Sequence, residues 1–306
     1  MSETKYAVEK DGMMVPPKQP DNDKYRSQRT VRMITNTISF IVLLVLALLF
    51  LSPIAIVVMN SFKGKFFLRT GQIFELLTKE SFVGWDNYKK GAERVGMFSA
   101  IKNSAIITVC AVIAIVLFTA MTAWYLTRVK TMVSNIIYYC FVFSMIVPFQ
   151  MVMFPMASLA DMLGLNTVYG LIVLYVGFGA GQCVFMFGGF IKSIPIDIEE
   201  AAMIDGCNPI QTFFRVVLPM LKPTMVTLAI LETMWVWNDY LLPKLILPTG
   251  TKTIPLAIDA CTGSHGVKEI GWLMAMLVIA IIPIIAFYLI CQKHIIKGVA
   301  AGAVKG

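Results

Sequence analysis

The chain has 306 residues, of which 58% are hydrophobic and only 14% are charged. This composition excludes an ordinary soluble domain, and the grouping of the apolar residues into long blocks indicates an all-α, polytopic membrane protein. The formal net charge is +8, but the basic residues flank the apolar blocks, which is typical of orientation in a bilayer rather than of nucleic-acid binding. The six cysteines form no CxxC pair and there are only two histidines, so we predict no metal site.

Residues 1–32 are polar and rich in lysine and arginine, so we expect a disordered cytosolic tail. The first apolar segment begins too far from the start to be the core of a cleavable signal peptide. We therefore interpret residues 33–60 as a first transmembrane helix. Residues 61–103 then form an extracytoplasmic loop, whose excess of basic over acidic residues is tolerated because long loops cross with less regard for charge.

Residues 104–292 are predicted to form a core of five further membrane helices, followed by a cytosolic tail at 293–306. Each apolar segment reaches the roughly 20 residues that a helix needs to cross the hydrocarbon layer. Lysine and arginine in the tails and inner loops place both termini in the cytosol of a cell (plasma or inner) membrane protein. The six predicted spans are Ile34–Met59, Ser104–Leu126, Met132–Leu159, Val168–Phe190, Met220–Leu242 and Gly271–Cys291.

Pro148 lies inside the third predicted span, where a proline removes a helix hydrogen bond and bends the helix. The polar Gln150 follows closely and is a candidate for facing a solute path. The alternative is that the bend only shapes the bundle, as prolines commonly do in membrane helices.

The inner loop at 191–222 is a polar segment between two membrane spans, with acidic residues at the start of a predicted helix. Gly206 is expected to stop this helix, and Asn208, Pro209 and Gln211 form the capping signals of a second short helix. Two such helices are compatible with a contact surface for another protein, and an ordinary amphipathic surface helix would leave the same pattern. The candidate contact residues are Glu199, Glu200, Ala201, Ala202, Asp205 and Gly206.

The fifth predicted span is the one that holds acidic residues, with Glu232 near its middle and Asp239 near its outer end. Charged groups at such depths are costly, so they are expected to face the bundle interior or water. Glu232, Trp235, Asn238 and Asp239 follow helical spacing and are expected to share one face. That face either lines a path for a polar solute or combines an interfacial aromatic belt with a polar contact between helices.

A known family shares the spacing of the inner loop. Glu200-Ala201-Ala202, then Gly206, then nine residues and Val216-x-Leu218-Pro219, resemble the EAA signature of permease subunits of ABC importers, with valine where isoleucine is usual. Three further stretches resemble the maltose-type carbohydrate branch of this family. They are Asn103-Ser104, the segment from Trp237 to Pro243, and the terminal Lys297-Gly298 with Gly302–Gly306.

The resemblance implies a type I (MetI-like) permease core of an ATP-driven importer for a sugar or oligosaccharide. It implies that Glu200, Ala201, Ala202 and Gly206 belong to a coupling helix that docks on a nucleotide-binding subunit, and we add Glu199 and Asp205 as neighbouring candidates. It also implies a second permease subunit, a pair of ATPase subunits that bind ATP and Mg²⁺, and an extracytoplasmic solute-binding protein. The sequence holds no GxxxxGK[ST] phosphate loop, so this chain is expected to bind no cofactor and to be non-catalytic.

Two other functions fit a polytopic membrane protein. A self-contained secondary transporter or channel for a small polar solute is disfavoured by the scarcity of charges inside the spans and by the lack of evident repeats. A membrane-embedded enzyme would need a catalytic constellation, and we identify none.

Overall fold

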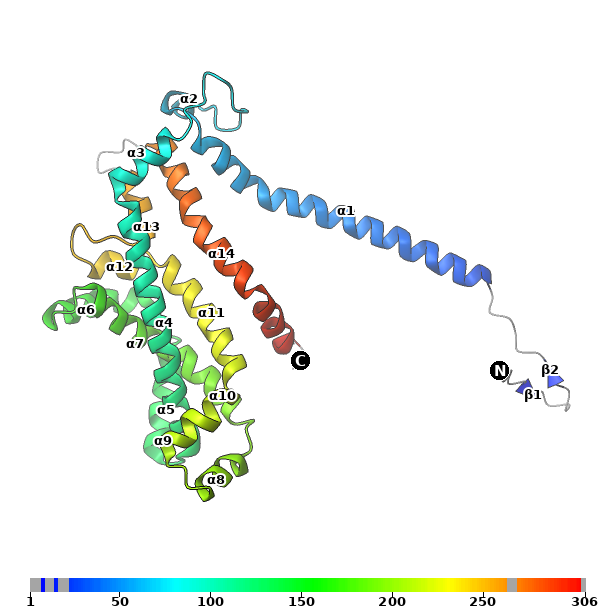
Figure 1. The fold of residues 1–306 in the computed structure, drawn as a ribbon, viewed down its shortest axis with the longest axis vertical. Coiled ribbons are helices and arrows are strands. Elements are labelled where there is room, and N and C mark those ends of the chain that lie inside the picture. The colour runs from blue at the N-terminus through cyan, green and yellow to red at the C-terminus, as the bar shows by residue number, and fades with distance from the viewer. Residues whose placement is uncertain (1–6, 9–13, 16–21, 263–268, 304–306) are drawn as a thin grey trace. The chain divides into compact units, whose positions relative to one another are not determined.

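A computed structural model of the chain describes residues 7–8, 14–15, 22–262 and 269–303 (Figure 1). The chain divides into two compact units, Met1–Ile56 and Val57–Gly306. The terminal tail motif is described only in its backbone as far as Ala303, and residues 304–306 lie outside the described part.

The first unit holds a short strand pair and most of a long helix. Strands β1 (Ala7–Val8) and β2 (Met14–Val15) pair antiparallel, and helix α1 (Asn22–Ser61) contains the first predicted span. Residues 22–32, which we expected to be disordered, are therefore helical. Once the apolar span has nucleated a helix, each added residue gains a backbone hydrogen bond, and lysine, arginine and glutamine are good helix formers.

In the second unit, the loop predicted at 61–103 contains helices α2 (Lys65–Arg69) and α3 (Asp86–Val95). Gly96 has a left-handed backbone with φ 70°, which ends α3 and starts α4 (Met97–Arg128). The second membrane helix thus begins before the predicted Ser104, because the glycine sets the boundary and not the first fully apolar turn.

Among the residues that the structure describes, four helices are long and apolar enough to cross a membrane, and the number rises to six if each of two bent helix pairs counts as one span. This agrees with the six predicted spans and with an all-α polytopic membrane protein. The four single segments are Val31–Ser61, Met97–Arg128, Val168–Ile191 within helix α7, and Ile270–Lys293 within helix α14 (Ile270–Ala303).

The third predicted span is not one helix. It consists of α5 (Met132–Ser144) and α6 (Phe149–Met162), which are bent by 109°. Pro148 immediately precedes α6 and has an extended backbone. Proline removes a backbone donor and disfavours a helical conformation in the residue before it, so the break falls at 145–148.

The fifth predicted span, Met220–Leu242, also differs from a single straight helix, because its helix α11 (Lys222–Asn238) ends early and the chain becomes extended at Asp239. At the start of this span, the preceding segment Pro209–Met220 meets α11 at 76°. Pro209–Met220 contains α9 (Pro209–Thr212), the π-helix η1 (Phe213–Val217) and α10 (Leu218–Met220). The polar end of the span is therefore a helix terminus, and Asp239 does not continue the helix that holds Glu232.

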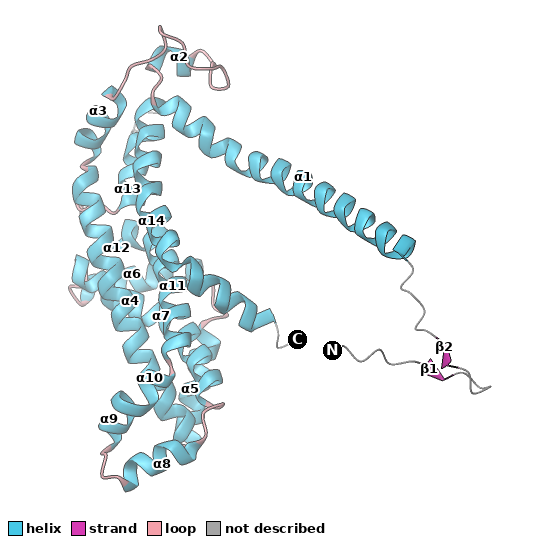
Figure 2. Ribbon diagram, turned by 45° about the vertical axis from the view of Figure 1, so that its right-hand side comes forward, coloured by secondary structure: helices cyan, strands magenta, loops and turns pink. Residues whose placement is uncertain are grey.

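The main core of this unit lies between α4, α7 and α11, which run beside one another (Figure 2). Close approach is set by small residues: a Cβ at Gly181 of α7 would lie 2.6 Å from Ser144 Oγ of α5. Helix α8 (Ile196–Ile204) and α9 lie at the opposite end of the unit from α2 and α3. The remaining short helices are α12 (Leu241–Ile246), α13 (Ile254–Asp259) and the 3₁₀ turn η2 (Ala260–Thr262).

Candidate functional site

Residues 196–212, here called the EAA segment, fold as the two predicted short helices. Helix α8 ends at Ile204, and Gly206 adopts the left-handed conformation with φ 88°, which confirms the predicted glycine stop. The capping box before α9 is also confirmed: Gln211 N donates to Asn208 Oδ1 at 2.8 Å, and Asn208 N donates to Gln211 Oε1 at 3.0 Å. Local sequence rules therefore fix the shape of the EAA segment.

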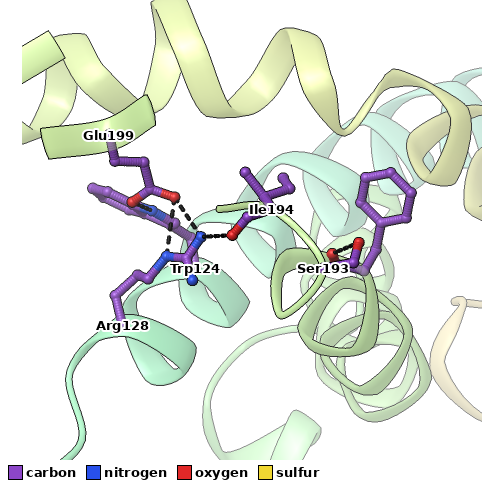
Figure 3. A network of polar contacts seen from close by, with 6 residues as sticks. Trp124, Arg128, Ser193, Ile194 and Glu199 are labelled. Atoms are coloured by element: carbon purple, nitrogen blue, oxygen red, sulfur yellow. Dashed lines mark hydrogen bonds and ion pairs between the residues drawn. The ribbon is translucent and has the colours of Figure 1, made fainter. Parts of the chain in front are cut away.

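Glu199 points into the subunit and not toward solvent. Its side chain is 2% exposed, and Oε2 accepts a hydrogen bond from Trp124 Nε1 at 2.9 Å. Oε1 accepts from Arg128 Nε at 3.0 Å and from Arg128 Nη2 at 2.7 Å (Figure 3). The same Nη2 donates to the carbonyl oxygen of Ile194 at 3.0 Å. We therefore correct the expectation that Glu199 offers its carboxylate to another protein, because both of its oxygens are already bonded within this chain.

The other predicted contact residues of the EAA segment are accessible. Glu200, Ala201, Asp205 and Gly206 are exposed, and Ala202 is half-buried. Large apolar side chains surround them, and Ile204 is 86% exposed. Clustered exposed apolar side chains are typical of surfaces that contact another protein or the membrane. The other exposed large apolar side chains are Ile196, Ile198, Met203, Ile210 and Phe214.

Arg128 and Trp124 were not predicted as site residues from the sequence. They lie one turn apart at the end of α4, where a cation ends an otherwise apolar helix and four-residue spacing puts both side chains on one face. That spacing was a usable signal. Their acidic partner, however, lies in another polar segment, and several acids there were equally eligible.

Glu232 lies in the interior of the bundle, as expected for an acid in a membrane span. Its side chain is 2% exposed, and Oε1 accepts a hydrogen bond from Cys183 Sγ of α7 at 3.3 Å. Oε2 has no hydrogen-bond partner among the described residues and lies beside Gly179, where an added Cβ would be 3.1 Å away. The glycine leaves room for the carboxylate between α4, α7 and α11.

Trp235 and Asp239 meet at Tyr175 of α7, a buried residue that sequence reasoning missed. Tyr175 Oη donates to Asp239 Oδ2 at 2.9 Å, and the Trp235 ring meets the Tyr175 ring edge-on with centroids 5.4 Å apart. Asp239 Oδ1 also accepts from the backbone N–H of Leu241 at 3.0 Å. Trp235 and Asp239 thus contact the same tyrosine, although Asp239 lies just beyond the last helical residue of α11.

Asn238 and Gln150 are both exposed, on α11 and in the first turn of α6. Asn238 borders a cavity of about 510 Å³ between α11, α13 and α14, with Tyr240 and Asp259 on the same rim. Asp259 Oδ2 accepts hydrogen bonds from Tyr240 Oη at 3.0 Å and from Lys244 Nζ at 3.2 Å. The hydrogen bond between Lys244 and Asp259 raises the pKa of Lys244. Most of the residues that line this cavity are apolar, and Asn238, Tyr240 and Asp259 supply a few polar groups that could bind a hydroxyl-bearing solute.

Comparisons with known proteins agree with this arrangement. Residues 115–301 match the family described as "Binding-protein-dependent transport system inner membrane component". The chain is 41% identical to the "Probable starch degradation products transport system permease protein AmyC" of Thermoanaerobacterium thermosulfurigenes, over 86% of this chain and 94% of that protein. It is 36% identical to the "Multiple sugar-binding transport system permease protein MsmG" of Streptococcus mutans, over 87% of this chain and 96% of that protein.

A solved structure shares the fold. The crystal structure of "a bacterial ABC transporter involved in the import of the acidic polysaccharide alginate" superposes with a TM-score of 0.72 at 22% identity, over 90% of this chain and 99% of that one. Together with the apolar helices, these matches favour a transport subunit over a self-contained secondary transporter or a membrane-embedded enzyme. The chain belongs to the inner-membrane components of binding-protein-dependent transport systems and is a multi-pass membrane permease subunit.

Proposed function

We propose that this chain is one permease subunit of an ATP-driven importer and forms part of the path for a sugar or oligosaccharide. The observation that supports this most strongly is near full-length similarity to permeases named for starch degradation products and for multiple sugars. The aromatic and polar side chains at the end of α11 suit the same class of solute.

The energy for transport comes from partner ATPase subunits that bind ATP and Mg²⁺ in this proposal. They dock on the EAA segment through Glu200, Ala201, Ala202, Asp205 and Gly206. Support comes from the exposed apolar side chains of this segment, which include Ile204 and Met203, because burying such side chains drives association between proteins. This chain is non-catalytic, and closure of the ATPases would move the EAA segment and shift the bundle between inward and outward access.

A second, homologous permease subunit and an extracytoplasmic solute-binding protein complete the proposed importer. Both termini of this chain face the cytosol of the plasma or inner membrane, so that the EAA segment is on the same side as the ATPases. The excess of lysine and arginine in the tails and inner loops supports this orientation.

The proposed solute path uses Trp235 and Asn238, which are exposed on α11, and Gln150 on α6. Glu232 and Asp239 are further candidates, and Tyr175 joins them as the residue that orients Asp239 and Trp235. Because Glu232 is buried, its contact with solute requires a different arrangement of α4, α7 and α11 during the cycle.

Reconstitution tests this function. The chain is purified from its native membrane, and we expect an ATPase subunit with a phosphate loop and a second permease to accompany it. Proteoliposomes that hold this complex and the solute-binding protein should accumulate a labelled maltodextrin only when ATP is present on the ATPase side. Uptake by the chain alone, driven by an ion gradient without any ATPase, would contradict the proposal.

A further inference from the structure

Helix α8 is attached to a membrane helix through a buried polar side chain. Within α8, all of which the structure describes, Glu199 alone is buried, while Ile196, Ile198 and Ile204 are exposed. Along the backbone, the main neighbours of α8 are α9 and η1, which follow it in the chain. The residue that joins α8 to a membrane helix is therefore a carboxylate and not an apolar side chain.

Arg128 and Trp124 hold this carboxylate at three points. Arg128 donates twice to Oε1, and Trp124 donates to Oε2 from one turn earlier in α4. Arg128 also binds the carbonyl of Ile194, so it clamps the chain that enters α8 as well as α8 itself (Figure 3). A guanidinium that donates from two nitrogens fixes the orientation of its partner as well as the distance.

Trp124 links the same cluster to the second half of the segment. Its ring lies 5.4 Å from the ring of Phe213 in η1, and Phe213 is buried. The π-helical turn that contains Phe213 is followed by α10 and then by the bend before α11. Trp124 thus touches α8 through Glu199 and η1 through Phe213, while α4 itself packs along α7 and α11.

Separating the half-buried Arg128 from the buried Glu199 leaves a carboxylate with little water to solvate it, so the pair resists opening. A displaced α8 therefore pulls on the end of α4 before the pair breaks. We propose that Glu199, Arg128 and Trp124 form a transmission clamp, which makes α8 and the end of α4 move as one body and carries ATPase-driven motion to α7 and α11. This inference rests on the proposed function, and the three are positioning residues that touch neither ATP nor solute.

The test measures coupling in the complete reconstituted importer. Glu199→Gln keeps the shape of the side chain but removes its charge, and Arg128→Lys keeps the charge but removes the two-nitrogen contact. We expect both variants to retain the ATPase subunits at normal yield, while the labelled maltodextrin transported per ATP hydrolysed falls about tenfold, within the range of typical allosteric coupling. Lys90→Gln, which breaks an exposed ion pair with Asp86 on α3, is the matched control and should leave the ratio unchanged.

If Glu199→Gln does not assemble, Trp124→Phe serves instead, since it retains the ring against Phe213 and removes only the N–H donor. An unchanged transport-to-hydrolysis ratio in these variants overturns the clamp. A loss of transport in proportion to lost complex also overturns it, because that result describes a merely structural pair. Failure of the proposed function is distinguishable: there the unaltered chain itself would show no ATP-dependent uptake.

Discussion

Most polar side chains are exposed in the EAA segment, whereas the acidic side chains within and just after α11 are hydrogen-bonded to another helix. In the EAA segment, Glu200 and Asp205 are exposed, and the backbone is shaped by a local glycine and a local capping box. At α11, Glu232 and Asp239 are bonded to Cys183 and Tyr175, which lie on another membrane helix. The exposed groups of the EAA segment are thus positioned by nearby residues in the chain, whereas the groups held inside the bundle depend on distant residues. Glu199 lies in the EAA segment, but like Glu232 and Asp239 it is bonded to residues on a distant helix.

The largest loss of stability is expected where a buried charged group depends on a distant residue. Arg128→Ala leaves the buried Glu199 carboxylate without its cation, with only the Trp124 N–H as partner. Removing one partner of a buried ion pair costs about 3–5 kcal/mol of the free energy of unfolding. Thermal unfolding of the purified subunit in nanodiscs should show a clearly lowered Tm.

An exposed pair supplies the comparison for this prediction. Lys90→Ala breaks the ion pair with Asp86 on the surface of α3, where water solvates both groups. No measurable change in Tm is expected. Equal Tm values for Arg128→Ala and Lys90→Ala would show that the Glu199 carboxylate is not held as tightly as its burial indicates.

The same division explains what could be predicted from sequence. Gly206, Asn208 and Gln211 act within a few residues of the chain, so the two helices of the EAA segment and their caps followed from spacing alone. The partner of Glu199 lies 71 residues away, and no local pattern shows which of the acids in the inner loop Arg128 binds. The family resemblance could name the docking motif, but it could not tell which of two adjacent glutamates faces inward.

The membrane helices show the same limit in another form. Hydropathy located six apolar segments, because it responds to composition over about 20 residues. It could not show that Pro148 divides the third segment into two helices, since apolar residues continue on both sides of the break. Nor could it show that α11 ends at Asn238, where Tyr175 and the N–H of Leu241 bind Asp239.

A glycine pair separates backbone strain from docking. Gly206 and Gly71 both have φ 88° with nothing close to an added Cβ. Alanine at either position must adopt a left-handed conformation, which costs about 1–2 kcal/mol. We therefore expect Gly206→Ala and Gly71→Ala to lower the Tm by similar amounts, whereas only Gly206→Ala should weaken binding of the ATPase subunit in a co-purification assay.

Equal ATPase binding by these two variants would remove Gly206 from the proposed docking surface. Unequal Tm values would instead show that one of the two turns relaxes around the new side chain. The two substitutions are chemically identical, so any difference between the two variants comes from the surroundings of each glycine.

Among the buried and docking residues compared in this way, the smallest effect on stability is expected at Glu232. No cation pairs with it in the part of the chain that the structure describes, so Glu232→Gln leaves no opposite charge behind, in contrast to Arg128→Ala. The amide oxygen can still accept from Cys183, and the free energy of unfolding should change by less than about 1 kcal/mol.

Sugar uptake by Glu232→Gln should nevertheless fall if the carboxylate accepts hydroxyl donors from solute, because an amide nitrogen donates where a carboxylate oxygen accepts. Uptake by proteoliposomes at matched protein levels checks this, with Cys183→Ser as a control that keeps the donor to Glu232. Unchanged uptake kinetics would take Glu232 out of the solute path and leave it as a polar contact between α7 and α11, the second of the two interpretations that its sequence allowed.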